Sequence, residues 1–161
     1  MENFANMEKE KKINIKEADS DNEIKRIWEI RNRPELRKVS TNQKEINLID
    51  HIKWFEEKYL KNKKNKCFVL NADNQTMGYC RLDLNDNNEY MVSIALDPTL
   101  QGKGLGTKLL QEAIKLLNTD KTILAEVKTG NKPSLKLFQK NNFEIYNKNK
   151  DYIHFRYITK K

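Results

Sequence analysis

The spacing of hydrophobic residues in the N-terminal part of the chain predicts one strand followed by two helices. Residues 12–18, KINIKEA, alternate hydrophobic and polar positions, which is typical of a strand. Ser20 and Glu23 then have the spacing of a capping box, and a helical face follows them. A second helix is predicted over residues 47–60, where one stripe consists of Leu48, Ile52, Phe55 and Tyr59.

The middle of the chain predicts three strands, over residues 66–71, 76–84 and 89–96. Short turns rich in asparagine and aspartate separate these runs, so we expect an antiparallel meander. The two cysteines, Cys67 and Cys80, fall inside the apolar runs and have no metal-ligand spacing. We therefore predict that both are core residues and that both remain thiols.

The second half alternates helices and strands. A helix with the apolar stripe Leu110, Ala113, Ile114 and Leu117 precedes a strand over 122–127. Because a helix connects that strand to the one at 89–96, the two should run parallel. A helix over 133–141 and two closing strands, FEIYN and DYIHFRYIT, complete the chain. The pattern predicts one α/β domain over residues 1–161, with a mixed sheet and a flexible tail at 1–11.

Composition and charge narrow the class of protein. No apolar run approaches the roughly 18 residues that a membrane span needs, and the N-terminus lacks the apolar core of a secretory signal. We expect a cytoplasmic protein with no membrane partner. Lys and Arg number 31 against 23 Asp and Glu, a formal net charge of +8, which suits an anionic partner. No nucleic-acid-binding signature accompanies that charge, so no specific nucleic acid is expected.

Glycine occupies every second position in the run QGKGLG, residues 101–106, directly before the third helix. A helix N-terminus has unpaired amide groups and a partial positive charge, so it can bind phosphate. Glycine removes the side chains that would keep a phosphate from the backbone. Neither the P-loop pattern nor the dinucleotide fingerprint fits this spacing. The remaining alternative is a flexible turn with a helix cap.

Two segments resemble the GNAT N-acetyltransferase superfamily. The run from Gln101 to Gly106 matches the family motif Q/R-x-x-G-x-G/A, and NKPSLKLFQKNNF at 131–143 resembles a later family segment. The resemblance implies a mostly antiparallel seven-stranded sheet flanked by four helices, with the fourth and fifth strands parallel and splayed apart. It also implies acetyl-CoA as the acetyl donor. No metal is expected, because His51 and His154 lie far apart in sequence and no Cys/His spacing surrounds them. Relatives are often dimers, so a homodimer is possible.

The resemblance assigns coenzyme contacts to two walls of that splay. The pyrophosphate would bind the glycine loop, the pantetheine arm would pair with the fourth strand, and the last helix would form the opposite wall. Asn131 and Ser134 could instead serve only as a cap and a first-turn residue of that helix. The implied coenzyme-binding residues are Ile94, Leu96, Gln101, Gly102, Lys103, Gly104, Leu105, Gly106, Thr107, Asn131, Ser134 and Phe138.

Direct attack of an amine on a thioester requires removal of a proton, because an alkyl amine is free in only about one molecule in a few thousand at pH 7. Glu126 and Glu89 are the candidate bases, although Glu126 could simply pair with a lysine. Many family members carry a tyrosine that protonates the leaving thiolate, whereas this chain has Phe138. Either the thiolate leaves unassisted, since it is a good leaving group, or a nearby tyrosine such as Tyr90 donates the proton.

Residues 27–57 resemble nucleotide-linked amino-sugar N-acetyltransferases of the pseudaminic acid type, through Arg31, Arg33, Arg37, His51 and Trp54. The resemblance implies that Arg31, His51 and Trp54 bind a UDP-linked amino sugar, since arginine suits a diphosphate and an aromatic ring can stack on a base. Trp54 could instead extend the core and His51 could be solvated. Two other functions stay open, namely acetylation of ribosomal-protein N-termini and a non-catalytic acyl-CoA-binding module.

Overall fold

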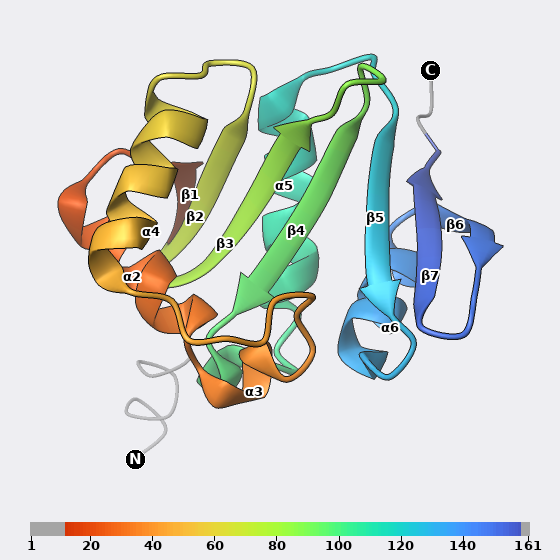
Figure 1. Cartoon of the computed structure of the whole chain (residues 1–161), viewed down its shortest axis with the longest axis horizontal. Helices are drawn as coiled ribbons and strands as arrows, with labels where there is room; N and C mark the ends of the chain where they lie inside the picture. Colours follow the sequence, from red (N-terminus) through yellow and green to blue (C-terminus); the bar gives the residue numbers. More distant parts are fainter. Residues whose placement is uncertain (1–11, 159–161) are drawn as a thin grey trace.

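The computed structural model describes residues 12–158 and contains one seven-stranded sheet (Figure 1). The predicted tail at 1–11 lies outside the described residues. The sheet order is β1-β2-β3-β4-β5-β7-β6, and the neighbours pair antiparallel except for the parallel β4 and β5. The predicted α/β architecture and the parallel pair are confirmed. The strands are β1 Ile13–Glu17, β2 Lys66–Ala72, β3 Gln75–Leu84, β4 Tyr90–Leu96, β5 Ile123–Lys128, β6 Phe143–Lys148 and β7 Tyr152–Tyr157.

Helices cover both faces of the sheet. The α2 and α4 helices pack on one face, while α5 and α6 pack on the other (Figure 1). The α-helices are α2 Asp21–Arg31, α3 Pro34–Arg37, α4 Leu48–Phe55, α5 Leu105–Leu117 and α6 Lys132–Lys140. A π-helical turn, η1 Glu56–Leu60, continues α4, and a 3-10 turn, η2 Pro98–Leu100, precedes the glycine loop.

Two helical details differ from the sequence prediction of four helices. The short α3 adds a fifth helix, which begins with Pro34 in its first turn and has no buried residue. It therefore leaves no hydrophobic period in the sequence. The helix predicted over 47–60 changes to π-helical geometry after Phe55, where the amide of Lys61 donates to the carbonyl of Glu56 at 2.9 Å.

The capping box at the start of α2 is confirmed. The amide of Glu23 donates to the Ser20 hydroxyl at 3.1 Å, and the amide of Ser20 donates to a Glu23 carboxylate oxygen at 3.2 Å. Burial alone would raise the pKa of Glu23, but hydrogen bonds from Lys16, Asn71 and two backbone amides lower it to about 2. Glu23 is therefore ionised in the folded chain and fixes the start of α2 against β1 and β2.

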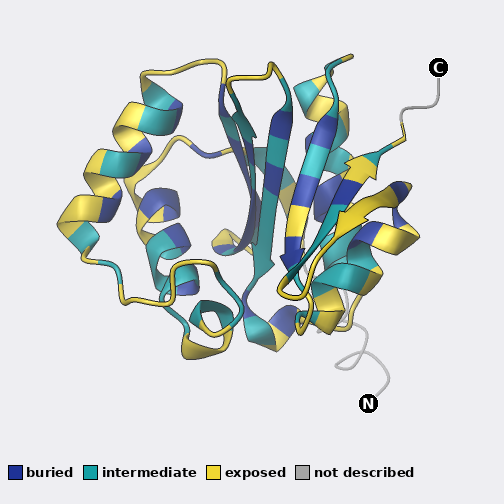
Figure 2. Ribbon diagram, turned by 45° about the vertical axis from the view of Figure 1, so that its right-hand side comes forward, coloured by how far each residue is buried: buried dark blue, intermediate teal, exposed yellow. Residues whose placement is uncertain are grey.

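The core consists of two apolar clusters, one on each face of the sheet. Cys67 belongs to the cluster under α2 and α4, and Cys80 belongs to the cluster under α5 and α6. Both thiols are free and buried, as predicted, and burial raises the pKa of each. Figure 2 shows that buried and half-buried residues dominate β2, β3 and β4, whereas β6 is exposed along most of its length.

The parallel strands β4 and β5 separate soon after they meet. They pair only at Tyr90 with Ile123 and at Met91 with Leu124, although β4 continues to Leu96 and β5 to Lys128. The predicted splay is thus present, and Figure 1 shows the two strands diverging toward the end that carries α3 and α6. The split places two strand edges beside the functional site.

Candidate active site

A cavity of about 810 Å³ extends along the split between β4 and β5. Its walls come from β4, the glycine loop, the end of β5, the start of α6, and the segment from α3 to residue 46. One end is therefore formed by the glycine loop and α6, and the other by residues on the α2 and α4 side of the sheet. We call these the loop end and the arginine end.

Positive backbone angles build the loop end. Gly102 has φ +81° and Gly104 has φ +77°, a region that residues with a Cβ rarely adopt. No atom lies within 4 Å of the place where either residue would carry a Cβ, so a side chain there would project into open space at the cavity. Gly104 is the N-cap of α5, and the first amides of that helix have no intrahelical partner. The loop presents bare backbone and a positive helix end to the cavity.

The ladder of β4 supplies further amides. The amide of Tyr90 donates toward β5, to the carbonyl of Thr122, whereas the amide of Asp97 donates toward β3, to the carbonyl of Met77. Because amide directions alternate along a strand, those of Ile94 and Leu96 point toward β5. The β4–β5 pairing has already ended at that point. These two N–H groups therefore face the split.

Most of the residues predicted to bind the coenzyme line the cavity. Those on its walls are Ile94, Leu96, Gln101, Gly102, Gly104, Gly106, Thr107, Asn131, Ser134 and Phe138. Lys103 and Leu105 are not among the lining residues, and Leu105 packs on the core instead. Asn131 also caps α6, where its side chain accepts from the amide of Ser134 at 3.4 Å. Phe138 is 3% exposed and packs against Phe143 and Phe155.

Three cavity-lining lysines were missed from the sequence, namely Lys128, Lys136 and Lys140. Lys136 and Lys140 are four residues apart on α6, which places them on one helical face. That spacing was visible in the sequence, but only the fold shows that the face lies beside the glycine loop. The loop end is thus positive in both backbone and side chains.

Of the three proposed catalytic residues, only Glu126 lies in the cavity. Its carboxylate is 3.8 Å from Nδ1 of His154, so its near side-chain neighbour is a histidine rather than a lysine. Tyr90 is buried in the core, and its hydroxyl donates to the carbonyl of Lys64 at 3.0 Å. Glu89 precedes β4 at the end where β4 and β5 are still paired. Because β4 begins at the end that is still paired with β5, Glu89 and Tyr90 lie outside the site. Two other tyrosines, Tyr79 and Tyr152, line the cavity.

Arg31 reaches the arginine end of the cavity, whereas His51 and Trp54 lie behind it. His51 is 1% exposed, with Nε2 2.8 Å from the carbonyl oxygen of Ile24 and Nδ1 3.1 Å from Arg31. Since a carbonyl only accepts, Nε2 carries the proton and Nδ1 accepts from Arg31. Burial, together with the charges of two nearby arginines, lowers the pKa of His51 to about 4, so the ring is neutral. The expectation that His51 faces a cleft is corrected, because its ring orients Arg31.

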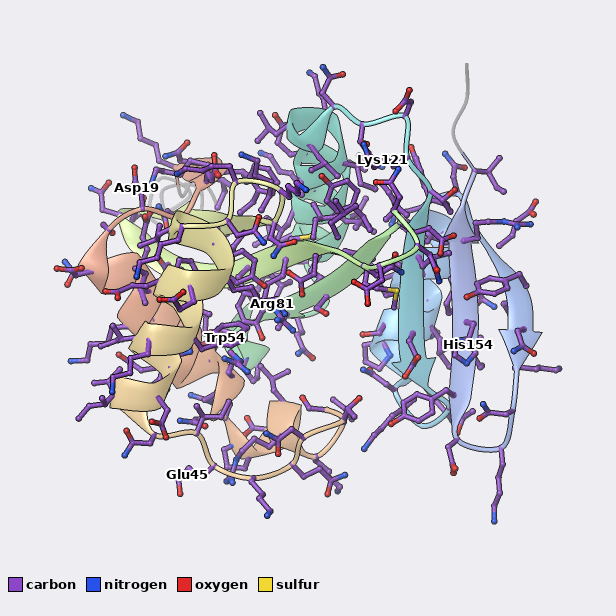
Figure 3. All side chains as sticks on the ribbon, turned by 45° about the horizontal axis from the view of Figure 1, so that its top comes forward. Asp19, Glu45, Trp54, Arg81, Lys121 and His154 are labelled. Carbon is purple, nitrogen blue, oxygen red and sulfur yellow. The ribbon has the colours of Figure 1, made fainter. Side chains whose placement is uncertain are left out.

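Arg81 is a second cavity-lining arginine that the sequence reasoning missed. The guanidinium carbons of Arg31 and Arg81 lie 4.2 Å and 5.2 Å from the ring centre of Trp54. Figure 3 labels Trp54 and Arg81, which approach one another from α4 and β3. Arg81 contacts the Tyr59 hydroxyl at 3.3 Å and Asp83 at 3.5 Å. Its buried Nε has no hydrogen-bond partner among residues 12–158. The sequence signal for Arg81 was a charged residue within the largely apolar run of β3.

A segment between α3 and α4 borders the arginine end. Four of its residues, from Val39 to Asn42, line the cavity together with Ile46. The side chain of Asn32 donates to the carbonyl of Ile46 and accepts from its amide, both at 2.8 Å. The indole N–H of Trp28 donates to the same carbonyl at 2.6 Å. The α2 helix therefore fixes one end of this segment, residues 38–46, which we call the strap.

Two further properties concern residues 12–158 as a whole. Within this range no histidine, cysteine and carboxylate side chains form a group of three or more that could hold a metal ion. Nor does any helix there have the length and apolar character needed to cross a membrane. The arrangement favours recognition of an anionic, phosphate-bearing molecule at the loop end.

The sequence matches the Acetyltransferase (GNAT) family over residues 24–143. It is also 30% identical over 135 residues to the acetyltransferase PseH of Campylobacter jejuni, covering 82% of this chain and 83% of that protein. The chain therefore belongs to the GNAT acetyltransferase family and is an acetyl-CoA-dependent N-acetyltransferase.

Solved structures support the fold assignment. The acetyltransferase yncA of Salmonella typhimurium, whose structure contains acetyl-CoA, aligns with a TM-score of 0.75 at 22% identity, over 89% of this chain and 92% of that one. The structure of Campylobacter jejuni PseH aligns with a TM-score of 0.65 at 24% identity, over 89% of this chain and 96% of that one. At these identities the comparisons support the fold rather than the acceptor.

Proposed function

We propose that this enzyme acetylates a primary amine on a nucleotide-linked amino sugar. The observation that carries the proposal is the pair of arginines at the end of the cavity opposite the coenzyme loop. Arg31 and Arg81 flank Trp54, and the Nε of Arg81 is buried without a hydrogen-bond partner in residues 12–158. Guanidinium groups bind phosphate with directed hydrogen bonds. An anionic acceptor would bind the two guanidinium groups that line the cavity.

The charges around the cavity favour the same acceptor. The only carboxylates on its walls, within residues 12–158, are Glu35 and Glu126, whereas five cations line it. Burial lowers the pKa of Arg31, so binding an anion there would offset a real desolvation cost. The resemblance of residues 27–57 to amino-sugar N-acetyltransferases agrees with this charge, as does the similarity to PseH.

Acetyl-CoA fits the opposite end of the cavity. The pyrophosphate would lie on the bare backbone of residues 102–107, with Lys136 and Lys140 nearby, and the pantetheine arm would follow the free edge of β4. The amides of Ile94 and Leu96 are directed into the split, where one of them would donate to the thioester carbonyl and stabilise the oxyanion. Asn131 and Ser134 would contact the arm from α6.

Glu126 would remove the proton from the acceptor amine, directly or through a water molecule. It is the candidate base that lines the cavity, and it comes from β5 where the split is open. The amine then attacks the thioester carbon, and the coenzyme leaves as a thiol once it has gained a proton. Phe138 cannot give that proton, so Tyr79 and Tyr152 become the candidate donors.

The test is release of free thiol from acetyl-CoA with a UDP-linked amino sugar as acceptor. A basic N-terminal peptide serves as the competing amine and tests ribosomal-protein acetylation. We expect turnover with the sugar and little with the peptide. Turnover with the peptide alone would contradict the proposed acceptor.

Phe138 gives one specific reason to consider a non-catalytic module that only binds acyl-CoA. Such a module would be stabilised by acetyl-CoA, as seen in its melting temperature, but would release no thiol with any amine. Restoring the missing hydroxyl with Phe138→Tyr provides the matched variant. If that change alone brought turnover, the binding module would be the correct description.

A further inference from the structure

We propose that His154 is a proton relay that carries the proton from Glu126 out of the active site. The proposal rests on the proposed role of Glu126 as the base. His154 lies on β7, outside the cavity, directly opposite Glu126 on β5. The distance from His154 Nδ1 to Glu126 Oε2 is 3.8 Å.

The sheet register fixes this neighbourhood. Residues paired across two antiparallel strands project on the same face, so Glu126 and His154 extend side by side from the face opposite α6. A distance of 3.8 Å is about 1 Å longer than a direct hydrogen bond. Catalytic hydrogen bonds are often long in the free enzyme and shorten when substrates bind. A small rotation of either side chain would close the gap.

The His154 side chain keeps 20% of its surface exposed, although it lies outside the cavity. Its ring is 6.0 Å from that of Tyr146, which is 46% exposed on β6. Figure 3 shows His154 on the strands at the far side of the split from Trp54 and Arg81. The charged and titratable groups on this face are Glu126 and Lys128 of β5, Tyr152 and Arg156 of β7, and Glu144 and Tyr146 of β6.

The proton balance of the reaction explains why a relay would be useful. An ammonium acceptor and acetyl-CoA become an amide, free thiol and one proton. The first proton leaves the ammonium group for Glu126. The second leaves the attacking nitrogen and replaces the proton that the tyrosine donor gives to the departing sulfur. Only the first must reach solvent before the next cycle. Bound substrates would cover the exposed 40% of the Glu126 side chain, whereas His154 lies outside the cavity.

The role of His154 is separable from simple packing. Its side chain is 20% exposed, and it belongs to neither buried cluster. His154→Gln keeps a polar side chain of similar size but cannot carry a proton. Arg156→Gln is the matched control, because Arg156 lies two positions further along β7 on the same face and does not line the cavity.

The experiment measures kcat at neutral pH in dilute and concentrated imidazole buffer, with the amine that the wild-type enzyme acetylates. In dilute buffer we expect His154→Gln to lower kcat by about tenfold, with little change in either KM. This loss is smaller than the roughly 100-fold to 10,000-fold effect of a direct acid or base, because His154 acts only through Glu126. Added imidazole should restore most of the loss by accepting the proton in place of His154. Wild type and Arg156→Gln should respond weakly to imidazole.

Three outcomes would overturn the relay. The first is an unchanged kcat in His154→Gln, and the second is a loss that imidazole does not restore. The third is a wild-type enzyme that acetylates no amine, which removes the proposed function as well. Glu126→Gln separates the two proposals further, because it should lose activity that imidazole cannot recover. If His154→Gln behaved like wild type while Glu126→Gln lost activity, the base would stand and the relay would fall.

Discussion

The two ends of the cavity are built from different parts of the chain. At the loop end the binding groups are backbone amides, presented by Gly102, Gly104 and the free edge of β4. At the arginine end they are side chains from β3 and α2, held by aromatic and histidine neighbours from α4. A backbone site needs one short motif, whereas a side-chain site needs several distant elements. The first should therefore be sensitive to local conformation and the second to charge and helix position.

The largest effect is expected from changing the glycine loop. Gly104→Val puts a β-branched residue at φ +77° and a side chain into the space where phosphate would lie. The KM for acetyl-CoA should rise on the order of 100-fold, which corresponds to about 2.7 kcal/mol of binding free energy. The KM for the acceptor should change little. Equal losses for both substrates, measured by steady-state kinetics, would remove the distinction between the two ends.

The second prediction tests how strongly Glu23 stabilises the start of α2, the helix that carries Arg31 at the arginine end of the cavity. Glu23→Gln removes a buried charge that accepts from Lys16 and the capping amides, so the free energy of unfolding should fall by about 2 kcal/mol at pH 7. The folded pKa of about 2 lies below the ordinary value of 4.5. The contribution is thus present above about pH 4.5 and disappears as the pH falls toward 2.

Urea unfolding at pH 7 and at pH 3 measures the free energy of unfolding of wild type and Glu23→Gln. The difference between wild type and Glu23→Gln should narrow at the lower pH. Glu29→Gln is the control, because Glu29 is half-exposed on the same helix and pairs with Arg26 at the surface. A constant difference across this range would show that the charge of Glu23 is not the source of the stability.

A smaller, selective effect is expected at the arginine end. Arg81→Met should raise the KM for the acceptor about 20-fold, as for loss of a charged hydrogen bond, and leave that for acetyl-CoA unchanged. The KM of Arg81→Lys for the acceptor should lie between those of wild type and Arg81→Met, because lysine keeps the charge but not the planar geometry. Arg33→Gln is the control, since Arg33 is absent from the cavity walls. An equal loss in Arg33→Gln would indicate general attraction instead of a specific contact.

The smallest effect concerns the strap. Asn32→Ala removes both hydrogen bonds to the backbone of Ile46, worth about 1 kcal/mol in total. We expect a rise of about fivefold in the KM for the acceptor, with the acetyl-CoA value retained. The same steady-state measurement checks it. An effect confined to acetyl-CoA would assign the strap to the loop end.

The sequence predicted the fold and the loop end well because both leave periodic or local signals. The capping box at Ser20 and the glycine loop each depend on neighbours in sequence, whereas the splay of β4 and β5 was expected only from the resemblance to the GNAT superfamily. Arg81 left only a weak signal, because its partners Tyr59 and Trp54 come from a helix more than twenty residues earlier. Tyr90 was misplaced because the direction of a strand relative to a cavity is a tertiary property.

The split between β4 and β5 also has a consequence for handling the protein. It leaves an unpaired strand edge in the middle of a sheet, next to the apolar side chains of Val92, Ile94 and Leu96. Open edges of this kind are templates for self-association. Coenzyme bound along β4 would cover that edge, so preparations stored with acetyl-CoA should resist precipitation longer than those stored without it.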